Sequence, residues 1–320
     1  MIDRRAVLVG AAISPLTFAP AWSEARETLD AVLMRGARVQ RVYDDGRWCE
    51  GPVWDRQGGT LVFSDVRKNR IMRLGDGGVA AAVRDPSNFA NGNAFDASGR
   101  LLTCEHLDRR VVRQEADGRL TVLADRFEGR RLNSPNDLIV ARDGAIWFTD
   151  PTFGIEQPEE GRQAASEQRG RFVFRIDPAG GIAKVADTFE QPNGLAFSPD
   201  ERILYVSDAS GGPDHPEGKR EIRTFDVRDG RSLTGERVFA TVPSGIADGL
   251  KVDSGGCVYA ATDGGATVWT VAGDRLGVIA TPGTCGNLAF GGTDGRRLFL
   301  CNGSSIHAVD LKVRGAGWRA

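Results

Sequence analysis

The sequence repeats one short phrase six times, and this repeat restricts the possible folds more than any other feature. Each copy leads into a short apolar run, as in Asn193-Gly194-Leu195-Ala196-Phe197. The copies begin at Glu50, Asn91, Asn136, Asn193, Asp248 and Gly286, at intervals of 38 to 57 residues. Intervals of this length are typical of propeller blades, which bury their faces only against each other. The repeat therefore predicts a single domain over residues 26–320, an all-β six-bladed β-propeller of four-stranded antiparallel blades.

Each unit contains three readable strands separated by turns. In the fourth unit the first two are 195–197 and 203–206, joined by a Ser-Pro-Asp turn. Elsewhere the turns are rich in Asp and Gly, which tolerate the backbone conformations of tight hairpins. The sixth unit has little chain left after its third strand, and residues 37–43 form a strand pattern without a unit of its own. We expect residues 37–43 to complete the sixth blade and close the ring, because closure removes the exposed strand edge.

The N-terminus has the pattern of an export signal. Arg4 and Arg5 precede an apolar stretch over residues 6–21, which ends in small residues like those of a cleavage site. This pattern predicts a signal peptide of the twin-arginine type over residues 1–25, and hence a periplasmic or secreted protein. A frayed cytosolic N-terminus is the alternative. The stretch is too short and too interrupted to predict a membrane span.

Charge and cysteine usage exclude several classes of protein. The chain has 41 basic and 43 acidic residues. It contains no long basic run, so a nucleic-acid partner is not expected. No sequence feature indicates an obligate protein partner. The five cysteines form no C-x-x-C pair, which argues against zinc-ribbon and thioredoxin-like sites. Cys104 and Cys301 lie within apolar strand patterns and are expected to be buried.

Oxygen donors occupy the first position of the phrase in five of its six copies. These donors are Glu50, Asn91, Asn136, Asn193 and Asp248. If the units close around one axis, the five side chains meet near it and form a cage for a hard cation. Such donors suit Ca²⁺, Mg²⁺ or Mn²⁺ better than structural zinc. The alternative is that these residues only shape the turn that enters each inner strand.

A second polar position follows the second strand of each unit. It holds Asp65, Glu105, Asp150, Asp208, Asp263 and Asn302. These side chains form either a second ring of carboxylates or a set of turn caps that accept backbone N–H groups. Because the position recurs in nearly every unit, whereas a site is usually asymmetric, we expect turn caps. His106 follows Glu105, and the pattern fits a substrate contact at the channel mouth as well as a surface residue.

Four segments at blade spacing resemble the SMP-30/gluconolactonase/luciferin-regenerating family. They are Glu50-Gly-Pro-Val-Trp54, Ser134-Pro-Asn-Asp137, Pro192-Asn-Gly-Leu-Ala-Phe-Ser-Pro-Asp200 and Asp248-Gly-Leu-Lys-Val-Asp253, and the likeness runs over roughly residues 37–311. The resemblance implies a six-bladed propeller with a divalent metal in its central channel. It also implies a hydrolase that opens sugar lactones, such as D-glucono-1,5-lactone to D-gluconate. Ca²⁺ is the cation expected first, and Mg²⁺, Mn²⁺ or Zn²⁺ are alternatives.

The resemblance also assigns roles to individual residues. The family's metal ligands correspond to Glu50, Asn136, Asn193 and Asp248. Asn91 lies in a unit that supplies no ligand in the family, so it is expected to line the substrate pocket. The segment 131–136 resembles the bacterial gluconolactonase branch, which makes Asn133 a further expected substrate contact. Some relatives carry Arg where this chain has Ser134, and this departure leaves the identity of the lactone open.

The implied mechanism is metal-assisted hydrolysis. The cation would polarise the lactone carbonyl and lower the pKa of a bound water. Asp248 is the first candidate for the catalytic base, and a role as ligand alone is the alternative. Two other functions stay open, namely hydrolysis of organophosphate esters at the same site and non-catalytic binding of a peptide or polysaccharide. The polar segment 157–169 is either a lid or merely a flexible loop.

Overall fold

The computed structural model describes residues 28–212, 215–242 and 244–318, so the predicted signal peptide lies outside the described residues. The described chain is almost entirely β-structure. Its one α-helix, α1 (Phe153–Glu156), is a single turn, and the three 3-10 helices are η1 (Leu29–Ala31), η2 (Val66–Lys68) and η3 (Asp76–Gly78). No helix within the described ranges is long and apolar enough to cross a membrane.

Four sheets each contain four antiparallel strands in chain order. The first has β2 (Cys49–Asp55), β3 (Thr60–Asp65), β4 (Arg70–Leu74) and β5 (Ala80–Arg84), and the second has β6 (Ala90–Phe95), β7 (Leu101–Glu105), β8 (Arg110–Gln114) and β9 (Leu120–Ala124). The third has β12 (Leu138–Val140), β13 (Ile146–Asp150), β14 (Arg171–Ile176) and β15 (Ile182–Phe189), and the fourth has β16 (Pro192–Phe197), β17 (Ile203–Asp208), β18 (Glu221–Arg228) and β19 (Ser232–Thr241). Two short strands, β10 (Arg126–Phe127) and β11 (Arg130–Arg131), form a separate hairpin.

The last two repeats share one six-stranded sheet, so five sheets of four or more strands are described where six were expected. This sheet contains β20 (Leu250–Val252), β21 (Val258–Trp269), β22 (Arg275–Gly291), β23 (Arg297–Asn302), β24 (Ser305–Asp310) and β1 (Gln40–Tyr43). The difference arises because β22 runs without a break from one repeat into the next. Its first part, to Thr284, pairs with β21, and its last part, from Cys285, pairs with β23. β1 pairs with β24 in antiparallel register.

β21 folds back on itself within its length. The Oγ1 atoms of Thr262 and Thr267 lie 2.8 Å apart, which a straight strand does not allow for residues five apart. Gly264 and Gly265 lie between them with φ of +79° and +135°, a conformation that favours glycine. β21 therefore contains a hairpin.

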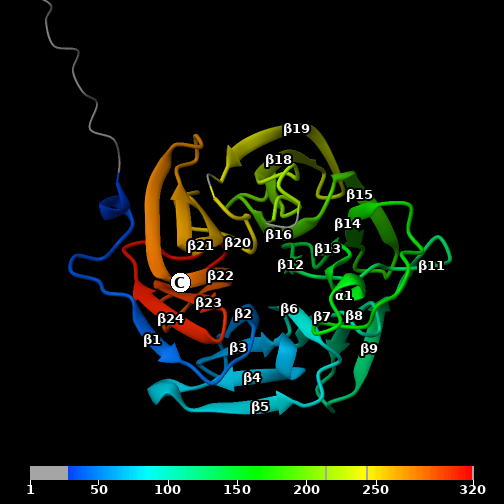
Figure 1. Cartoon of the computed structure of the whole chain (residues 1–320), viewed down its shortest axis with the longest axis horizontal. Helices are drawn as coiled ribbons and strands as arrows, with labels where there is room; N and C mark the ends of the chain where they lie inside the picture. Colours follow the sequence, from blue (N-terminus) through cyan, green and yellow to red (C-terminus); the bar gives the residue numbers. More distant parts are fainter. Residues whose placement is uncertain (1–27, 213–214, 243, 319–320) are drawn as a thin grey trace, which may run out of the picture.

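The sheets surround a common centre in a propeller-like arrangement (Figure 1). The strands nearest to this centre are β2, β6, β12, β16, β20 and β22 (Figure 1). Hydrophobic clusters lie between neighbouring sheets. One joins Leu61 and Phe63 of β3 to Phe299 and Cys301 of β23, and another joins Cys104 of β7 to residues of the third sheet. The expected burial of Cys104 and Cys301 is confirmed.

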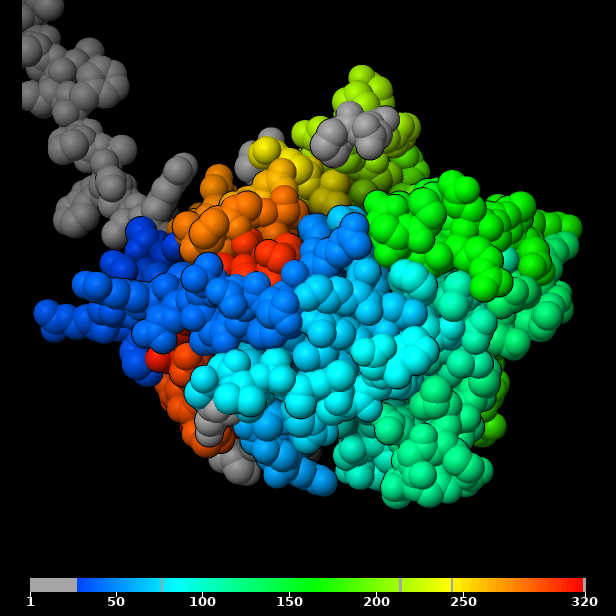
Figure 2. All heavy atoms as spheres, turned by 60° about the horizontal axis from the view of Figure 1, so that its bottom comes forward, coloured from blue at the N-terminus to red at the C-terminus, as the bar shows by residue number. Residues whose placement is uncertain are grey.

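Two long connections leave the same end of the sheets at which the inner strands begin. Residues 151–170, which we call the strap, join β13 to β14, and residues 209–220 join β17 to β18. The registers Leu138↔Phe148 and Pro192↔Asp208 place the ends of β13 and β17 beside the starts of their inner strands. Both connections stand on the face that is turned upward in Figure 2. We call this face the mouth face.

A candidate active site at the centre of the sheets

All five oxygen donors predicted from the repeat are buried at the starts of the inner strands. The exposed fractions are 3% for Glu50, 3% for Asn91, 5% for Asn136, 4% for Asn193 and 9% for Asp248. Backbone hydrogen bonds connect neighbouring copies of the phrase. The N–H of Gly92 donates to the carbonyl of Asn136, and that of Gly194 donates to the carbonyl of Asp248. The repeat therefore has a structural role as well, because its copies bond to one another around the centre.

Close approach of the chains explains the glycine in the phrase. A Cβ on Gly194 would lie 2.3 Å from the carbonyl oxygen of Asp248, a distance that no side chain tolerates. A Cβ on Gly286 would lie 2.2 Å from Glu50 Oε1 and 3.8 Å from Asp248 Oδ2. Oxygens of both carboxylates therefore approach the same point above Gly286, and a side chain at this position would displace the Glu50 carboxylate.

Burial raises the pKa of both carboxyl groups, because charge is disfavoured away from water. Negative charge on Glu50 and Asp137 raises the pKa of Asp248 further, and Asp137 does the same for Glu50. Hydrogen bonds oppose these effects. Gly51 N–H donates to Glu50 Oε2 at 3.0 Å, and the amide of Asn193 bonds to Asp248. The centre is thus a buried group of acids whose ionised forms are disfavoured unless a positive charge balances them.

Asp137 and Asn287 belong to the same centre, although the sequence analysis did not select them. Asn287 Nδ2 lies 3.4 Å from Asp137 Oδ2, and both residues are 2% exposed. Burial raises the pKa of Asp137, and the positive charge of Lys251 lowers it. A signal was present in the sequence: these two residues occupy the second position of the phrase, where the other four copies have glycine.

Glu160 is a fourth buried acid and comes from the strap. It is 6% exposed, and its negative charge contributes to the raised pKa of Glu50 and of Asp248. Arg67 Nη2 donates to Glu160 Oε1 at 2.8 Å. No repeat or motif marks this residue, because the strap has no counterpart in the other units. Through Glu160 the strap brings a buried acid to the site, and the choice between the two expectations for 157–169 stays a prediction.

Two of the three expected substrate contacts carry a buried acceptor without a hydrogen-bond partner. These atoms are Asn91 Oδ1 and His106 Nε2. Asn91 lies in β6, and His106 directly follows the neighbouring strand β7; the register Ala90↔Glu105 places the two diagonally across the strand pair, with the N–H of His106 bonded to the carbonyl of Phe89. His106 is fully buried, so the alternative of a surface residue is wrong. Unpartnered buried acceptors are rare in proteins and call for a donor from a ligand or water.

Asn133 has a different environment from the other two. Its Nδ2 donates to the carbonyls of Asp150 and Gly170, and its Oδ1 accepts from Ser166 Oγ. Ser134 Oγ bonds to Pro151 O and to Gly154 N. Asn133 and Ser134 thus fasten both ends of the strap. The amide of Asn133 has no free N–H for a substrate, and its role as a substrate contact stays a prediction.

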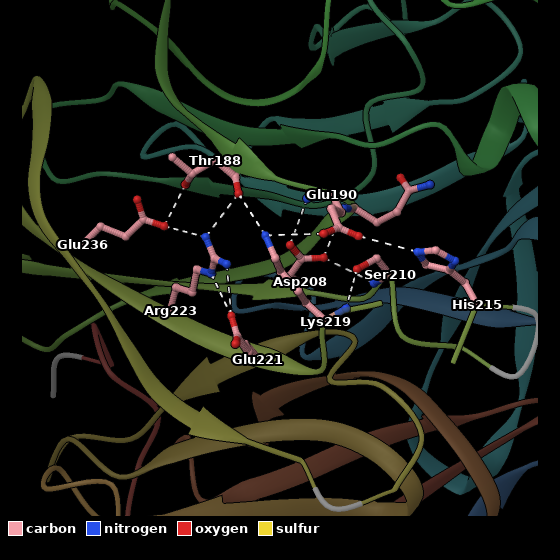
Figure 3. Close-up of polar contacts among 10 residues, drawn as sticks. Thr188, Glu190, Asp208, Ser210, His215, Lys219, Glu221, Arg223 and Glu236 are labelled. Carbon is pink, nitrogen blue, oxygen red and sulfur yellow. Dashed lines mark hydrogen bonds and ion pairs between the residues drawn. The ribbon is translucent and has the colours of Figure 1, made fainter. Parts of the chain in front are cut away.

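Three of the six residues at the second polar position cap turns, as expected, whereas Glu105, Asp263 and Asn302 bond to the side chains of Arg110, Thr284 and Thr281. Asp65 Oδ1 accepts the N–H groups of Arg47 and Trp48, and Asp150 accepts those of Asn133 and Ser134. Asp208 accepts the N–H groups of Glu190, Gln191 and Ser210 at the base of residues 209–220 (Figure 3). These carboxylates satisfy backbone donors that would otherwise be buried without partners.

A metal site built from three or more His, Cys, Asp or Glu side chains is absent from the described ranges. The predicted set contains only two carboxylates, Glu50 and Asp248, and its other members are the amides of Asn136 and Asn193. The convergence of the two carboxylates above Gly286 and their buried negative charge fit a divalent cation. A donor set that consists only of side-chain oxygens favours a hard cation such as Ca²⁺ over structural zinc.

Comparison with known proteins places the chain in a family. Residues 48–304 match the model of the SMP-30/gluconolactonase/LRE-like region. A gluconolactonase of Zymomonas mobilis is 30% identical over 316 residues, which cover 90% of this chain and 85% of that protein. A pentonolactonase of Haloferax volcanii is 29% identical and covers 82% of this chain and 84% of its own length. A solved structure of a gluconolactonase of Xanthomonas campestris is 44% identical, covers 86% of this chain and 89% of its own, and superposes with a TM-score of 0.81. This chain therefore belongs to the SMP-30/gluconolactonase/LRE-like family.

Proposed function

We propose that this protein hydrolyses sugar lactones, with D-glucono-1,5-lactone as the first candidate substrate. The observation that carries the proposal is the convergence of Glu50 and Asp248 above Gly286 in a buried, negatively charged centre. The similarity to gluconolactonases and a pentonolactonase supports the same chemistry. A sugar lactone is small and rich in hydroxyl groups, and the unpartnered acceptors of Asn91 and His106 suit such a ligand.

The proposed cofactor is one divalent cation, with Ca²⁺ first, held by Glu50, Asn136, Asn193 and Asp248. A cation bound there would act as a Lewis acid toward the lactone carbonyl. The two carboxylates balance its charge, and the two amides add oxygen donors without further negative charge. Asn287 and Asn193 bond to the carboxylates and hold them in place.

Asp248 is the proposed proton acceptor. Among the four proposed ligands only the two carboxylates accept protons near neutral pH, because amides do not. Glu50 is bonded to Gly51 N–H and to the amide of Asn287, whereas Asp248 has one side-chain partner, Asn193. Asp248 would take the proton of the attacking water as its oxygen adds to the carbonyl carbon. The ring C–O bond then breaks, the proton passes from Asp248 to the leaving ring oxygen, which becomes a free hydroxyl group, and the new carboxylic acid releases its own proton to water.

The proposed architecture behind this site is a ring of six blades. The six-stranded sheet would hold the last two blades, with β22 passing from the outer edge of one to the inner strand of the other. The pairing of β1 with β24 supports closure of the ring by the N-terminal strand. Export through the predicted signal peptide also stays a proposal, because residues 1–25 are outside the described residues.

The decisive experiment is an assay of purified protein with glucono-1,5-lactone, in the presence of Ca²⁺ and after removal of cations by EDTA. We expect acid release that EDTA abolishes and Ca²⁺ restores. Turnover that survives complete removal of cations would contradict the cation site. Absence of turnover on a panel of five- and six-membered sugar lactones would contradict the function, and it would favour a binding propeller.

A further inference from the structure

His106 is enclosed between the start of its own hairpin and the strap. A Cβ on Gly154, in α1, would lie 2.5 Å from His106 Cβ and Cγ, so only glycine lets the helix come this close to the ring. The imidazole Nδ1 lies 3.0 Å from the backbone carbonyl oxygen of Glu160. Two points of the strap therefore fix the ring, one by packing and one by a hydrogen bond.

This hydrogen bond determines which ring nitrogen carries the proton. A carbonyl oxygen accepts hydrogen bonds and cannot donate, so Nδ1 of His106 must be the N–H. Burial lowers the pKa of His106 to about 4, and the ring is therefore neutral at pH 7. The second nitrogen, Nε2, then has a free lone pair. It is buried and has no hydrogen-bond partner among the described residues.

The position of the Glu160 carbonyl depends on the side chain of the same residue. Arg67, in η2, donates to Glu160 Oε1 from Nε at 3.1 Å and from Nη2 at 2.8 Å. The Arg67 guanidinium also lies over the ring of Trp48, 4.8 Å from its centroid. Arg67 belongs to the first repeat and the strap to the third, so this ion pair ties the strap across the mouth face.

We propose that Arg67 and Glu160 are positioning residues that hold His106 in its Nδ1–H tautomer, so that Nε2 accepts a hydrogen bond from a hydroxyl group of the substrate. The nature of the ligand rests on the proposed function. Asn91 Oδ1, on the neighbouring strand, is a second unpartnered acceptor. Two fixed acceptors on paired strands select a ligand with several hydroxyl donors, because an analogue without them leaves both atoms buried and unpaired.

The tautomer can be observed directly by nuclear magnetic resonance. The chain has three histidines, so a sample labelled with ¹⁵N-histidine gives three sets of ring signals, and the His106→Asn variant identifies that of His106. Long-range ¹H–¹⁵N correlations at pH 7 should show a protonated Nδ1 and an unprotonated Nε2. D-gluconate, the open-chain product, should shift the Nε2 signal of His106 and leave His215 unchanged. A protonated Nε2, or no response of His106 to D-gluconate, would overturn the proposal.

Substitution of the ion pair tests the positioning role. In Arg67→Met, the His106 ring signals should show exchange between the two tautomers. KM should rise about 3- to 10-fold, which corresponds to the loss of one neutral hydrogen bond, and kcat should change less. Glu160→Gln keeps the shape of the side chain and should act in the same direction with a smaller effect. The matched control is Lys68→Met, which removes the neighbouring ion pair to Asp45 outside the strap and should change neither readout.

The His106→Asn variant tests the roles of the two ring nitrogens separately. The Asn amide can replace Nδ1–H as donor to Glu160 O but cannot replace Nε2, so we expect a folded protein with KM raised about 3- to 10-fold. Unchanged KM in both His106→Asn and Arg67→Met would overturn the proposal. Failure of the proposed function looks different: no lactone would be hydrolysed, whereas the protonated Nδ1 of His106 and its dependence on Arg67 would remain as expected.

Discussion

Acidic side chains serve two distinct purposes in this chain, and the two sets differ in how their oxygens are satisfied. Glu50 and Asp248 begin copies of the repeated phrase and approach one point above Gly286, and the negative charge of Glu50 raises the pKa of Asp248. Asp65 and Asp208 end second strands and accept two or three backbone N–H groups each. Both sets recur along the chain and both are buried. Recurrence and burial therefore do not distinguish a site from a structural cap, whereas the hydrogen bonds do.

The first set should be needed for activity and dispensable for folding. We expect Asp248→Asn and Glu50→Gln to lower kcat by a factor on the order of 10³, because each removes a carboxylate from the proposed cation site. In cation-free protein the free energy of unfolding should stay the same or rise, since a buried negative charge is removed. Kinetics and denaturant unfolding of each variant measure the two effects. Full activity in either variant would contradict the distinction between acids that belong to the site and acids that cap turns.

The second set should behave in the opposite way. Asp208→Asn replaces one acceptor oxygen by an N–H₂ group that faces backbone donors, so we expect a loss of about 1–3 kcal/mol in the free energy of unfolding. At a temperature where the variant is folded, kcat should be close to that of the wild type. Asp200→Asn is the control, because the Asp200 side chain is 61% exposed. A variant that is stable but inactive would place Asp208 in the site.

The pH dependence of stability should also separate the sets. Burial raises the pKa of Glu50 above its ordinary value of 4.5, and burial with the Glu50 charge raises that of Asp248. The folded chain therefore holds more protons than the unfolded chain above about pH 4.5, and the free energy of unfolding of cation-free protein should fall as pH rises. Saturating Ca²⁺ should reduce this slope, and the part that remains is expected from Asp150, whose pKa is raised to about 7 by burial. A cation-free protein whose stability rises from pH 5 to pH 8 would contradict the repulsion between these groups.

The smallest effect is expected at Asn91. This residue occupies the first position of the repeated phrase, as Glu50 and Asp248 do, but it is not one of the two carboxylates that approach the point above Gly286. Asn91→Ala should raise KM for the lactone about 10-fold and leave the affinity for Ca²⁺ unchanged, because its unpartnered Oδ1 is assigned to the substrate. Steady-state kinetics measure KM for the lactone, and calorimetric titration measures the affinity for Ca²⁺. An equal loss of Ca²⁺ affinity would make Asn91 a fifth ligand.

The repeat predicted the parts of the fold and site that recur. Each first-position donor lies at the start of an inner strand, and the second polar position supplies caps in three of the six units, at Asp65, Asp150 and Asp208. Parts that occur once were not predicted. Glu160 comes from the strap, whose packing depends on Ser134 and Arg67 far away in sequence. The continuity of β22, which merges two units into one sheet, also left no signal in the spacing.

Asp137 and Asn287 show what a closer comparison of the copies can reveal. They replace the glycine of the phrase in two units, and their side chains meet at the centre. Glycine elsewhere in this position reports close chain contact, so a side chain there has to occupy the channel itself.

Calorimetric titration of Ca²⁺ into EDTA-treated, dialysed protein tests most directly whether Glu50, Asn136, Asn193 and Asp248 share one ion. We predict one Ca²⁺ per chain in the wild type, at least a tenfold weaker site in Asp248→Asn and in Glu50→Gln, and an unchanged site in Asp208→Asn. Absence of binding to the wild type, or equal binding to all four proteins, would contradict a shared cation.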